Sequence, residues 1–212
     1  MGVYRTFCYK VEDVFVGLFS KKQDPEEVKQ KVKEYRDQKE AIKQKKKEAA
    51  QKQAEEAKRQ KELKKEQEHQ EVLALLSKVL DLNNTNYTEY EYREVKTNKH
   101  FFQQLVQTIY EPEEQGLTFL HCEFDKTRNK EIKGYLIATN KRVWFVSKSL
   151  QFQQKFRYQT IKDLRYHRDG ILEKELKIQY GTKKLEFDEI YEPKQLQKLV
   201  NIIERNSLNV HC

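Results

Sequence analysis

The feature that most limits how this chain can fold is a long stretch without proline or glycine. After Pro25 no proline occurs before Pro112, and after Gly17 no glycine occurs before Gly116. Within this stretch, residues 20–71 are mostly Lys, Glu, Gln and Ala, which favour helix but cannot supply a hydrophobic core. The sequence therefore predicts a long solvated helix, and a compact domain has to be built from the residues that follow it.

The predicted helix covers residues 24–82. Asp24 can cap its start, Pro25 suits the first helical position, and Glu26 and Glu27 favour the positive end of the helix dipole. Its last turns are apolar, so we expect them to be buried against the C-terminal domain, another helix or a partner chain. These apolar residues are Val72, Leu73, Leu75, Leu76, Val79, Leu80 and Leu82.

A coiled coil needs two apolar columns at heptad spacing, and this helix offers only part of one. Glu56 interrupts the first column, and the second holds Val32 before Lys39, Lys46, Gln53 and Gln60 follow it. Both a weak, self-associating coiled coil and a solvated single helix therefore stay open. The first column consists of Val28, Tyr35, Ile42, Ala49 and Leu63.

Residues 1–23 contain a short amphipathic segment. Its apolar side chains recur at the spacing of one helical face, with Lys10 at the edge. Three interpretations stay open: a helix on a membrane surface, a helix docked on the protein's own domain, or an upstream extension in which residues 1–16 precede the native start. The apolar residues are Val11, Val14, Phe15, Leu18 and Phe19.

Residues 83–116 are interpreted as a linker and a short helix. Tyr90 and Tyr92 alternate with charged residues, which predicts a short extended segment. Asn98 then begins a helix, which ends before Pro112 and Gly116. The apolar face of that helix is Phe101, Phe102, Leu105, Val106 and Ile109.

From Leu117 onwards the hydrophobic period changes from that of a helix to that of strands. Hairpin turns are indicated at Thr139-Asn140-Lys141 and at Asp169-Gly170. A final helix starts after Glu192 and carries an apolar face of Leu196, Leu199, Val200 and Ile203. Seven short strands are predicted, at residues 117–124, on both sides of the turn in 134–148, and at 151–157, 160–167, 172–180 and 185–187.

The run from Gly134 to Phe145 follows the pattern Gly-x-Leu-x-x-Thr-Asn-x-Arg-Val-x-Phe. It resembles the central hairpin of pleckstrin-homology-like (PH-like) domains, in particular the bacterial YokE-like PH domains and the GRAM domains. The resemblance implies an α+β fold, with a long N-terminal helix before a seven-stranded antiparallel β-barrel or sandwich that a C-terminal helix caps. The expected parts are 1–23, 24–82, 83–116, a PH-like domain at 117–206, and a tail at 207–212.

Charge and cysteine content limit the partners and the compartment. The formal net charge is +8, from 42 basic and 34 acidic residues, so both an anionic partner and plain solvated charge stay open. Cys8, Cys122 and Cys212 are few and far apart, which favours a reducing compartment. No apolar run is long enough to span a membrane and no signal peptide is evident. We expect a cytoplasmic protein, with peripheral membrane attachment as the alternative.

The candidate binding site is a basic loop between the first two strands, together with the following turn. In PH domains that bind lipids this loop holds phosphates, but Glu131-Ile132-Lys133-Gly134 replaces the basic triplet of the eukaryotic motif. This departure argues against specific phosphoinositide binding, and two alternatives stay open: an ordinary solvated loop, or a loop attracted non-specifically to an anionic surface. The candidate residues are Lys126, Arg128, Lys130, Lys133, Lys141 and Arg142.

Motifs of catalysis and metal binding are absent from the sequence. There is no glycine loop for phosphate, no Gly-x-Ser-x-Gly and no His-Glu-x-x-His, and we expect no enzyme, cofactor or metal. The sequence favours a non-catalytic adaptor, in which the PH-like domain recognises a protein or an anionic membrane surface and the helix sets spacing or self-association. The alternative is a nucleic-acid-binding protein that uses the Lys-rich helix. A third option is a peripheral membrane protein anchored by the first twenty residues.

Overall fold

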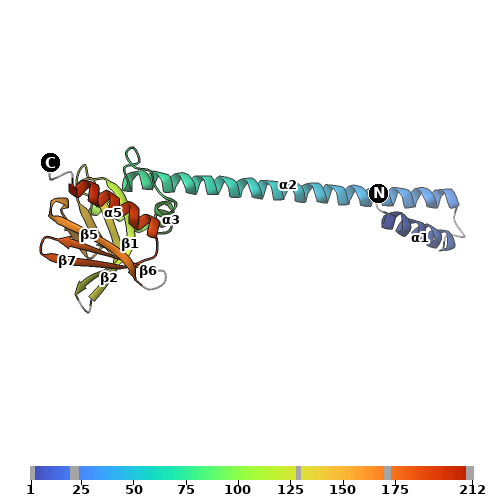
Figure 1. Ribbon diagram of the computed structural model, residues 1–212. Coiled ribbons are helices and arrows are strands. Elements are labelled where there is room, and N and C mark those ends of the chain that lie inside the picture. The colour runs from blue at the N-terminus through green and yellow to red at the C-terminus, as the bar shows by residue number, and fades with distance from the viewer. Residues whose placement is uncertain (1–2, 20–23, 128–129, 170–172, 209–212) are drawn as a thin grey trace. The chain divides into compact units, whose positions relative to one another are not determined.

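The computed structural model describes residues 3–19, 24–127, 130–169 and 173–208. The chain forms two compact units, Met1–Lys65 (unit 1) and Glu66–Cys212 (unit 2). Figure 1 shows the elements of both. None of the helices in the described ranges combines the length and apolar character needed to cross a bilayer.

Unit 1 contains helix α1 (Val3–Phe19) and the first part of helix α2 (Pro25–Val79). Within this unit α1 lies alongside the beginning of α2 (Figure 1). As predicted, α2 begins at Pro25, and the backbone N–H of Glu26 donates to the Asp24 carboxylate at 3.1 Å. An exposed ion pair between Glu27 and Lys31 adds little stability, because solvent screens it.

The end of α2 belongs to unit 2, and of the apolar residues predicted to be buried there, Val72, Leu76, Val79 and Leu80 are buried, whereas Leu73, Leu75 and Leu82 are half-buried. The buried residues pack on helix α4 (Lys99–Thr108) and on the outer face of the sheet, in a cluster that includes Tyr135 and Trp144. Leu76 is fully buried there. The partner of the apolar turns is therefore the C-terminal domain itself.

Residues 89–97 differ from the prediction of an extended segment, because they form helix α3 (Glu89–Thr97). A capping box explains the difference: the Thr88 side chain accepts from the Glu91 N–H, and the Glu91 carboxylate accepts from the Thr88 N–H. The alternation of Tyr90 and Tyr92 with charged residues suggested a strand, but the reciprocal cap fixes the first helical turn. The predicted short helix after Asn98 is confirmed as α4.

Within the described ranges, seven antiparallel strands form one sheet in the order β4-β3-β2-β1-β7-β6-β5. The predicted PH-like architecture of seven strands and a C-terminal helix is thereby confirmed. A 3-10 turn, η1 (Tyr158–Thr160), precedes β5. The strands are β1 (Gly116–Thr127), β2 (Lys130–Thr139), β3 (Val143–Ser147), β4 (Gln153–Phe156), β5 (Ile161–Asp169), β6 (Glu173–Tyr180) and β7 (Lys183–Ile190).

The predicted central hairpin is formed by β2 and β3 around Asn140. Its turn is closed by a hydrogen bond from the Thr139 N–H to the Arg142 carbonyl at 2.8 Å. Gly134 is required in the middle of β2, where its pairing with β3 ends, because a Cβ there would lie 2.3 Å from the carbonyl oxygen of Val146. The glycine at the head of the sequence pattern thus permits the close approach of β3.

The sheet separates two hydrophobic clusters. The inner cluster lies between the sheet and helix α5 (Pro193–Leu208), which packs on β1, β2, β5 and η1 and buries the four apolar residues predicted for its face. The outer cluster covers β1 to β3 with α2 and α4, and its Trp144 donates to the buried carboxylate of Glu114 at 2.9 Å. Because both faces of β1 to β3 are covered, β3 is buried along its whole length.

Candidate functional site

An open groove of about 220 Å³ lies beside α3 on unit 2, and we call it the α3 groove. Aromatic rings and charges of both signs line it. Its residues are Tyr90, Arg93, Glu94, Leu120, His121, Lys148, Glu189, Tyr191 and Glu192. They come from α3, β1, the segment after β3, and the end of β7 with the residues that lead into α5.

Hydrogen bonds from the sheet hold one wall of the α3 groove in place. The Tyr90 hydroxyl accepts from the His121 N–H at 2.8 Å, and burial raises the pKa of this tyrosine far above its usual range. The Tyr135 hydroxyl donates to the Glu94 carboxylate at 2.7 Å. Both contacts join α3 to β1 and β2, so the groove has a rigid floor and wall.

Charges of both signs stand at the rim of the α3 groove. Arg93 forms an ion pair with Glu192 at 2.6 Å, and the Lys148 ammonium lies 5.9 Å from the centre of the Tyr135 ring. The Tyr191 side chain is 59% exposed, which leaves its ring available for contact. The rim can therefore meet both a carboxylate and an N–H donor of a ligand.

His121 is the one imidazole of the α3 groove. Burial, together with the positive charge of Lys148, lowers its pKa below the usual 6.5, so the ring is neutral at pH 7. Its Nε2 atom is buried and has no hydrogen-bond partner within the described part of the chain. The neighbouring Cys122 is not a reactive thiol, because burial raises its pKa well above the usual range.

The residues predicted to bind an anion lie in two places. Arg128 lies outside the described residues, and of Lys126 and Lys130 the structure describes only the backbone, in β1 and β2. The polar loop expected at residues 125–130 is shorter than predicted, since β1 extends to Thr127 and β2 begins at Lys130. Lys126 lies near the end of β1, and Lys130 and Lys133 lie in the first half of β2.

Lys133 sits among carboxylates. Its ammonium lies 2.6 Å from Glu189 and 3.4 Å from Glu123. Hydrogen bonding with Lys133 lowers the pKa of Glu189, whereas burial and then Glu189 raise that of Glu123. Burial, reinforced by nearby carboxylates, also raises the pKa of Asp125 and raises that of Asp188 to about 6. An anionic ligand at Lys133 would thus have to compete with negative charge.

Lys141 and Arg142 lie at the opposite end of β2, and the structure does not bring them together with the loop residues. The Lys141 ammonium donates to the Pro112 carbonyl at 2.6 Å. The Arg142 guanidinium donates twice to Glu111, at 2.9 and 2.6 Å, and its Nε lies 3.4 Å from Glu114. Both cations stabilise the turn before β1 against the central hairpin.

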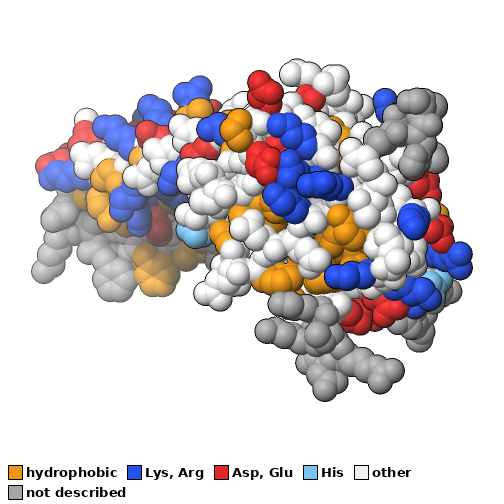
Figure 2. Space-filling model, turned by 90° about the vertical axis from the view of Figure 1, so that its left-hand side faces the viewer, with side chains coloured by type: hydrophobic (Ala, Val, Ile, Leu, Met, Phe, Trp, Pro, Cys, Tyr) orange, Lys and Arg blue, Asp and Glu red, His pale blue; other side chains and the backbone are white. Residues whose placement is uncertain are grey.

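Figure 2 shows one face of the molecule, where Lys and Arg side chains are interspersed with Asp, Glu and apolar side chains. In the described ranges, no group of three His, Cys, Asp or Glu residues is placed to hold a metal ion. The α3 groove was missed by sequence reasoning because α3 was expected to be extended. The signal that could have found it is the capping-box pattern Thr88-x-x-Glu91.

The fold is that of a PH-like domain, a class whose members are generally binding modules and typically non-catalytic. Residues 111–205 match the family model of the bacterial PH domain, so the chain carries a bacterial PH domain preceded by a long charged helix. The predicted resemblance is thereby confirmed.

Several solved structures are similar to the chain. The C-terminal domain of an unknown protein from Leishmania infantum has a TM-score of 0.39 and 16% identity, over 53% of this chain and 98% of that one. The Vps36 N-terminal PH domain has a TM-score of 0.39 and 11% identity, over 48% and 85%. The PH domain of USP37 has a TM-score of 0.35 and 12% identity, over 43% and 97%. These similarities are weak and support no functional conclusion. No curated protein matches the chain.

Proposed function

We propose that this protein is a non-catalytic adaptor whose PH domain binds a segment of a partner protein in the α3 groove, with α2 as a helical spacer. The observation that carries this proposal is the mixture of side chains in the groove. Tyr90 and Tyr191 offer aromatic surface, while Arg93 and Glu192 offer opposite charges next to each other. Aromatic residues and arginine dominate the binding energy of protein interfaces, so this mixture suits a polypeptide ligand.

A phosphate-bearing ligand fits the α3 groove less well. Glu94, Glu189 and Glu192 share the groove with the two cations Arg93 and Lys148, so there is no excess of positive charge. A polypeptide carries N–H donors, carbonyls and side chains of either sign, and can pair with both kinds of rim group. His121 lines the groove as a neutral ring at pH 7, and its Nε2 atom is buried, so the rim groups are the ones that can pair with such a segment.

Attraction of an anionic surface to Lys126, Arg128 and Lys130 stays a prediction. It is tested by replacing all three with Gln and measuring binding of the full chain to phosphatidylserine vesicles. If the unchanged chain binds the vesicles and the triple Gln variant does not, an anionic membrane becomes the favoured ligand of the PH domain.

Site-specific photo-crosslinking tests the groove directly. A benzoylphenylalanine replaces Tyr191 in one full-length variant and Tyr166 in a matched control, whose side chain is 45% exposed on β5. We expect a discrete partner to be cross-linked from position 191 and not from position 166. A peptide from the cross-linked segment should then bind the purified protein, and Tyr191→Ala should weaken it about tenfold or more, as for an aromatic anchor.

Two results would contradict the proposal. Identical cross-links from both positions would mean that the groove does not select the partner. If the purified chain has a hydrolytic or transferase activity that changes at His121 abolish, the protein is an enzyme and not a non-catalytic adaptor.

The molar mass of the full chain in solution distinguishes two roles of α2, a spacer in a monomer or an oligomerising helix in a dimer. Tyr35, Ile42 and Leu63 are more than half exposed in the single chain. Light scattering on the full chain should give the mass of a monomer if α2 is a spacer. A dimer that dissociates in Ile42→Gln/Leu63→Gln would instead make α2 a coiled coil.

A further inference from the structure

Helix α1 contacts α2 with the more polar of its two sides. The Tyr9 hydroxyl donates to Glu40 at 2.7 Å, and Arg36 lies 3.2 Å from Glu12 and 2.9 Å from Asp13. The Arg36 guanidinium also stands 4.5 Å from the centre of the Tyr9 ring, and its side chain is only 18% exposed. The acidic residues of α1 are thus turned toward α2 and neutralised there.

The opposite side of α1 presents an apolar stripe to solvent. Phe7, Val11, Val14 and Leu18 recur at the spacing of one helical face and are 41 to 64% exposed. An amphipathic helix in a folded protein normally buries such a stripe against its own core. Here the side of α1 that faces α2 carries Tyr9 and the acidic residues that pair with Arg36. The apolar stripe lies on the other side of α1 and is available to contact another surface.

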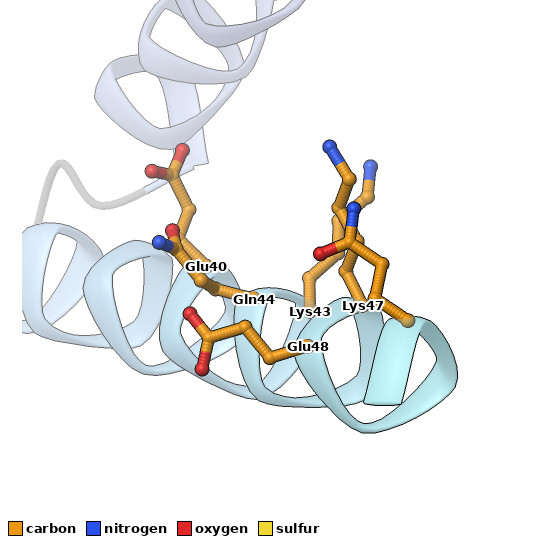
Figure 3. Close-up of a pocket in the computed structure, with 6 residues that line it drawn as sticks. Glu40, Lys43, Gln44, Lys47 and Glu48 are labelled. Atoms are coloured by element: carbon orange, nitrogen blue, oxygen red, sulfur yellow. The ribbon is translucent and has the colours of Figure 1, made fainter. Parts of the chain in front are cut away.

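Positive charge is concentrated in the same unit. Residues 1–65 carry 19 Lys and Arg against 12 Asp and Glu, a formal net charge of +7, whereas residues 66–212 carry 23 against 22. Lys43 and Lys47 border a shallow hollow of about 380 Å³ on α2, and both extend toward the side to which Glu40 points (Figure 3). Since Glu40 binds Tyr9, that is the side on which α1 lies.

We propose that unit 1 binds an anionic lipid surface, with the apolar stripe of α1 inserted at the level of the headgroups and the lysines of α2 above the lipid phosphates. Helices of this kind lie in the interface with their apolar face buried about 5–10 Å, and anionic lipids add electrostatic attraction to that burial. This proposal is independent of the α3 groove, which belongs to unit 2.

Two other partners for the apolar stripe, a second copy of this chain and a nucleic acid, fit unit 1 less well. A second copy would bring one unit of net charge +7 against another, and the two carboxylates of α1, Glu12 and Asp13, are already paired with Arg36. A nucleic acid would satisfy the lysines but would leave Phe7, Val11, Val14 and Leu18 in water. A bilayer with acidic headgroups satisfies both features at once.

The test is flotation of the full chain with vesicles of phosphatidylcholine alone or with 30% phosphatidylserine. We expect binding only to the acidic vesicles, weaker at high salt. Val11→Gln/Val14→Gln/Leu18→Gln should reduce the affinity about a hundredfold, because three apolar side chains no longer enter the interface. Leu63→Gln, an equally exposed apolar residue on α2, is the matched control and should change it less than about twofold.

A second pair of variants tests the lysines. Lys43→Gln/Lys47→Gln should weaken binding about 25-fold, at roughly fivefold for each cation near an anionic surface. Lys45 and Lys52 lie on the opposite side of α2 by helical period, so Lys45→Gln/Lys52→Gln removes the same charge and should have the smaller effect.

Three outcomes would overturn the proposal. In the first, no variant of unit 1 changes vesicle binding. In the second, the full chain fails to float with acidic vesicles. In the third, light scattering shows a dimer that the triple variant dissociates, which would assign the stripe to a second copy. None of these results bears on cross-linking from Tyr191, so this proposal and that of the groove fail separately.

Discussion

The two units of this chain differ in how far their apolar side chains are buried and their charges are paired. In unit 2, apolar residues fill two clusters on the faces of the sheet, and cations such as Arg142 and Lys198 lie against carboxylates. In unit 1, Phe7 and Tyr35 are largely exposed, and almost all of the net charge of the chain is found there. A domain that buries its apolar side chains and pairs its charges is stable without a partner. Exposed apolar side chains and uncompensated charge indicate where a partner binds.

The largest expected effect on the free energy of unfolding comes from a comparison of two leucines of α2. Leu76→Ala removes a fully buried side chain and should lower the free energy of unfolding by about 2–5 kcal/mol. Leu63→Ala, at a site 57% exposed, should change it by less than about 0.5 kcal/mol. Urea unfolding is followed by Trp144 fluorescence and by circular dichroism at 222 nm. Similar losses in both variants would mean that Leu63 is buried in solution and that the contrast between the units is wrong.

A smaller effect is expected from the buried carboxylate of Glu91. It accepts from Thr118 at 2.6 Å, from Gln195 at 2.9 Å, and from the Lys198 ammonium at 2.8 Å. Glu91→Ala should cost about 3 kcal/mol, because three donors lose their acceptor. Glu192→Ala, which breaks a solvent-exposed ion pair, should cost less than about 1 kcal/mol in the same urea assay.

A double variant separates charge pairing from packing at this site. If Lys198 is stabilised mainly by Glu91, then Glu91→Ala/Lys198→Met should cost less than the sum of the two single changes. Additive costs would show that the two side chains contribute independently.

The smallest effect concerns Asp188 and its dependence on pH. Burial, then Asp125 and Glu123, raise the pKa of this carboxyl from 3.8 to about 6. The folded state therefore holds its proton more tightly than the unfolded state. The stability from this group is complete below about pH 4 and is lost as the pH rises through 6.

Asp188→Asn removes this dependence. The variant should gain roughly 1 kcal/mol over the unchanged protein at pH 8, after allowance for partial exposure, and nothing at pH 4. Asp163→Asn changes an exposed carboxylate on β5 and is the control for surface charge. A gain that is the same at both pH values would show that ionisation of Asp188 is not its cause.

Much of the fold was accessible to sequence reasoning because its signals are local. Asn140 marks the turn of the central hairpin, Pro25 marks the start of α2, and Leu196 and Ile203 share the buried face of α5. Strand alternation and helical period each depend on neighbours within a few residues, and tertiary contacts did not overrule them. The α3 error has the same origin, since alternation outweighed the cap at Thr88.

The sites were less accessible, because they depend on contacts between distant segments. Nothing local shows that Lys133 lies beside Glu189, or that Arg142 is held by Glu111. The α3 groove likewise combines residues from 90 to 192 and requires knowledge of where α3 lies on the sheet. The amphipathic character of α1 was visible in the sequence, but the direction of its apolar stripe was not. That direction is set by Arg36 on α2.

The network around Glu91 also constrains how the polypeptide is made. Its acceptor atoms are presented by α3 and β1, whereas Gln195 and Lys198 are translated about a hundred residues later. Until those two residues have been synthesised, the Glu91 carboxylate lacks two of the donors that it has in the folded domain. The central strand β1 must likewise wait for β7, which it pairs at Glu123 and Phe124. Unit 2 should therefore fold only after most of the chain has been synthesised, and a nascent chain arrested before residue 195 should be sensitive to protease.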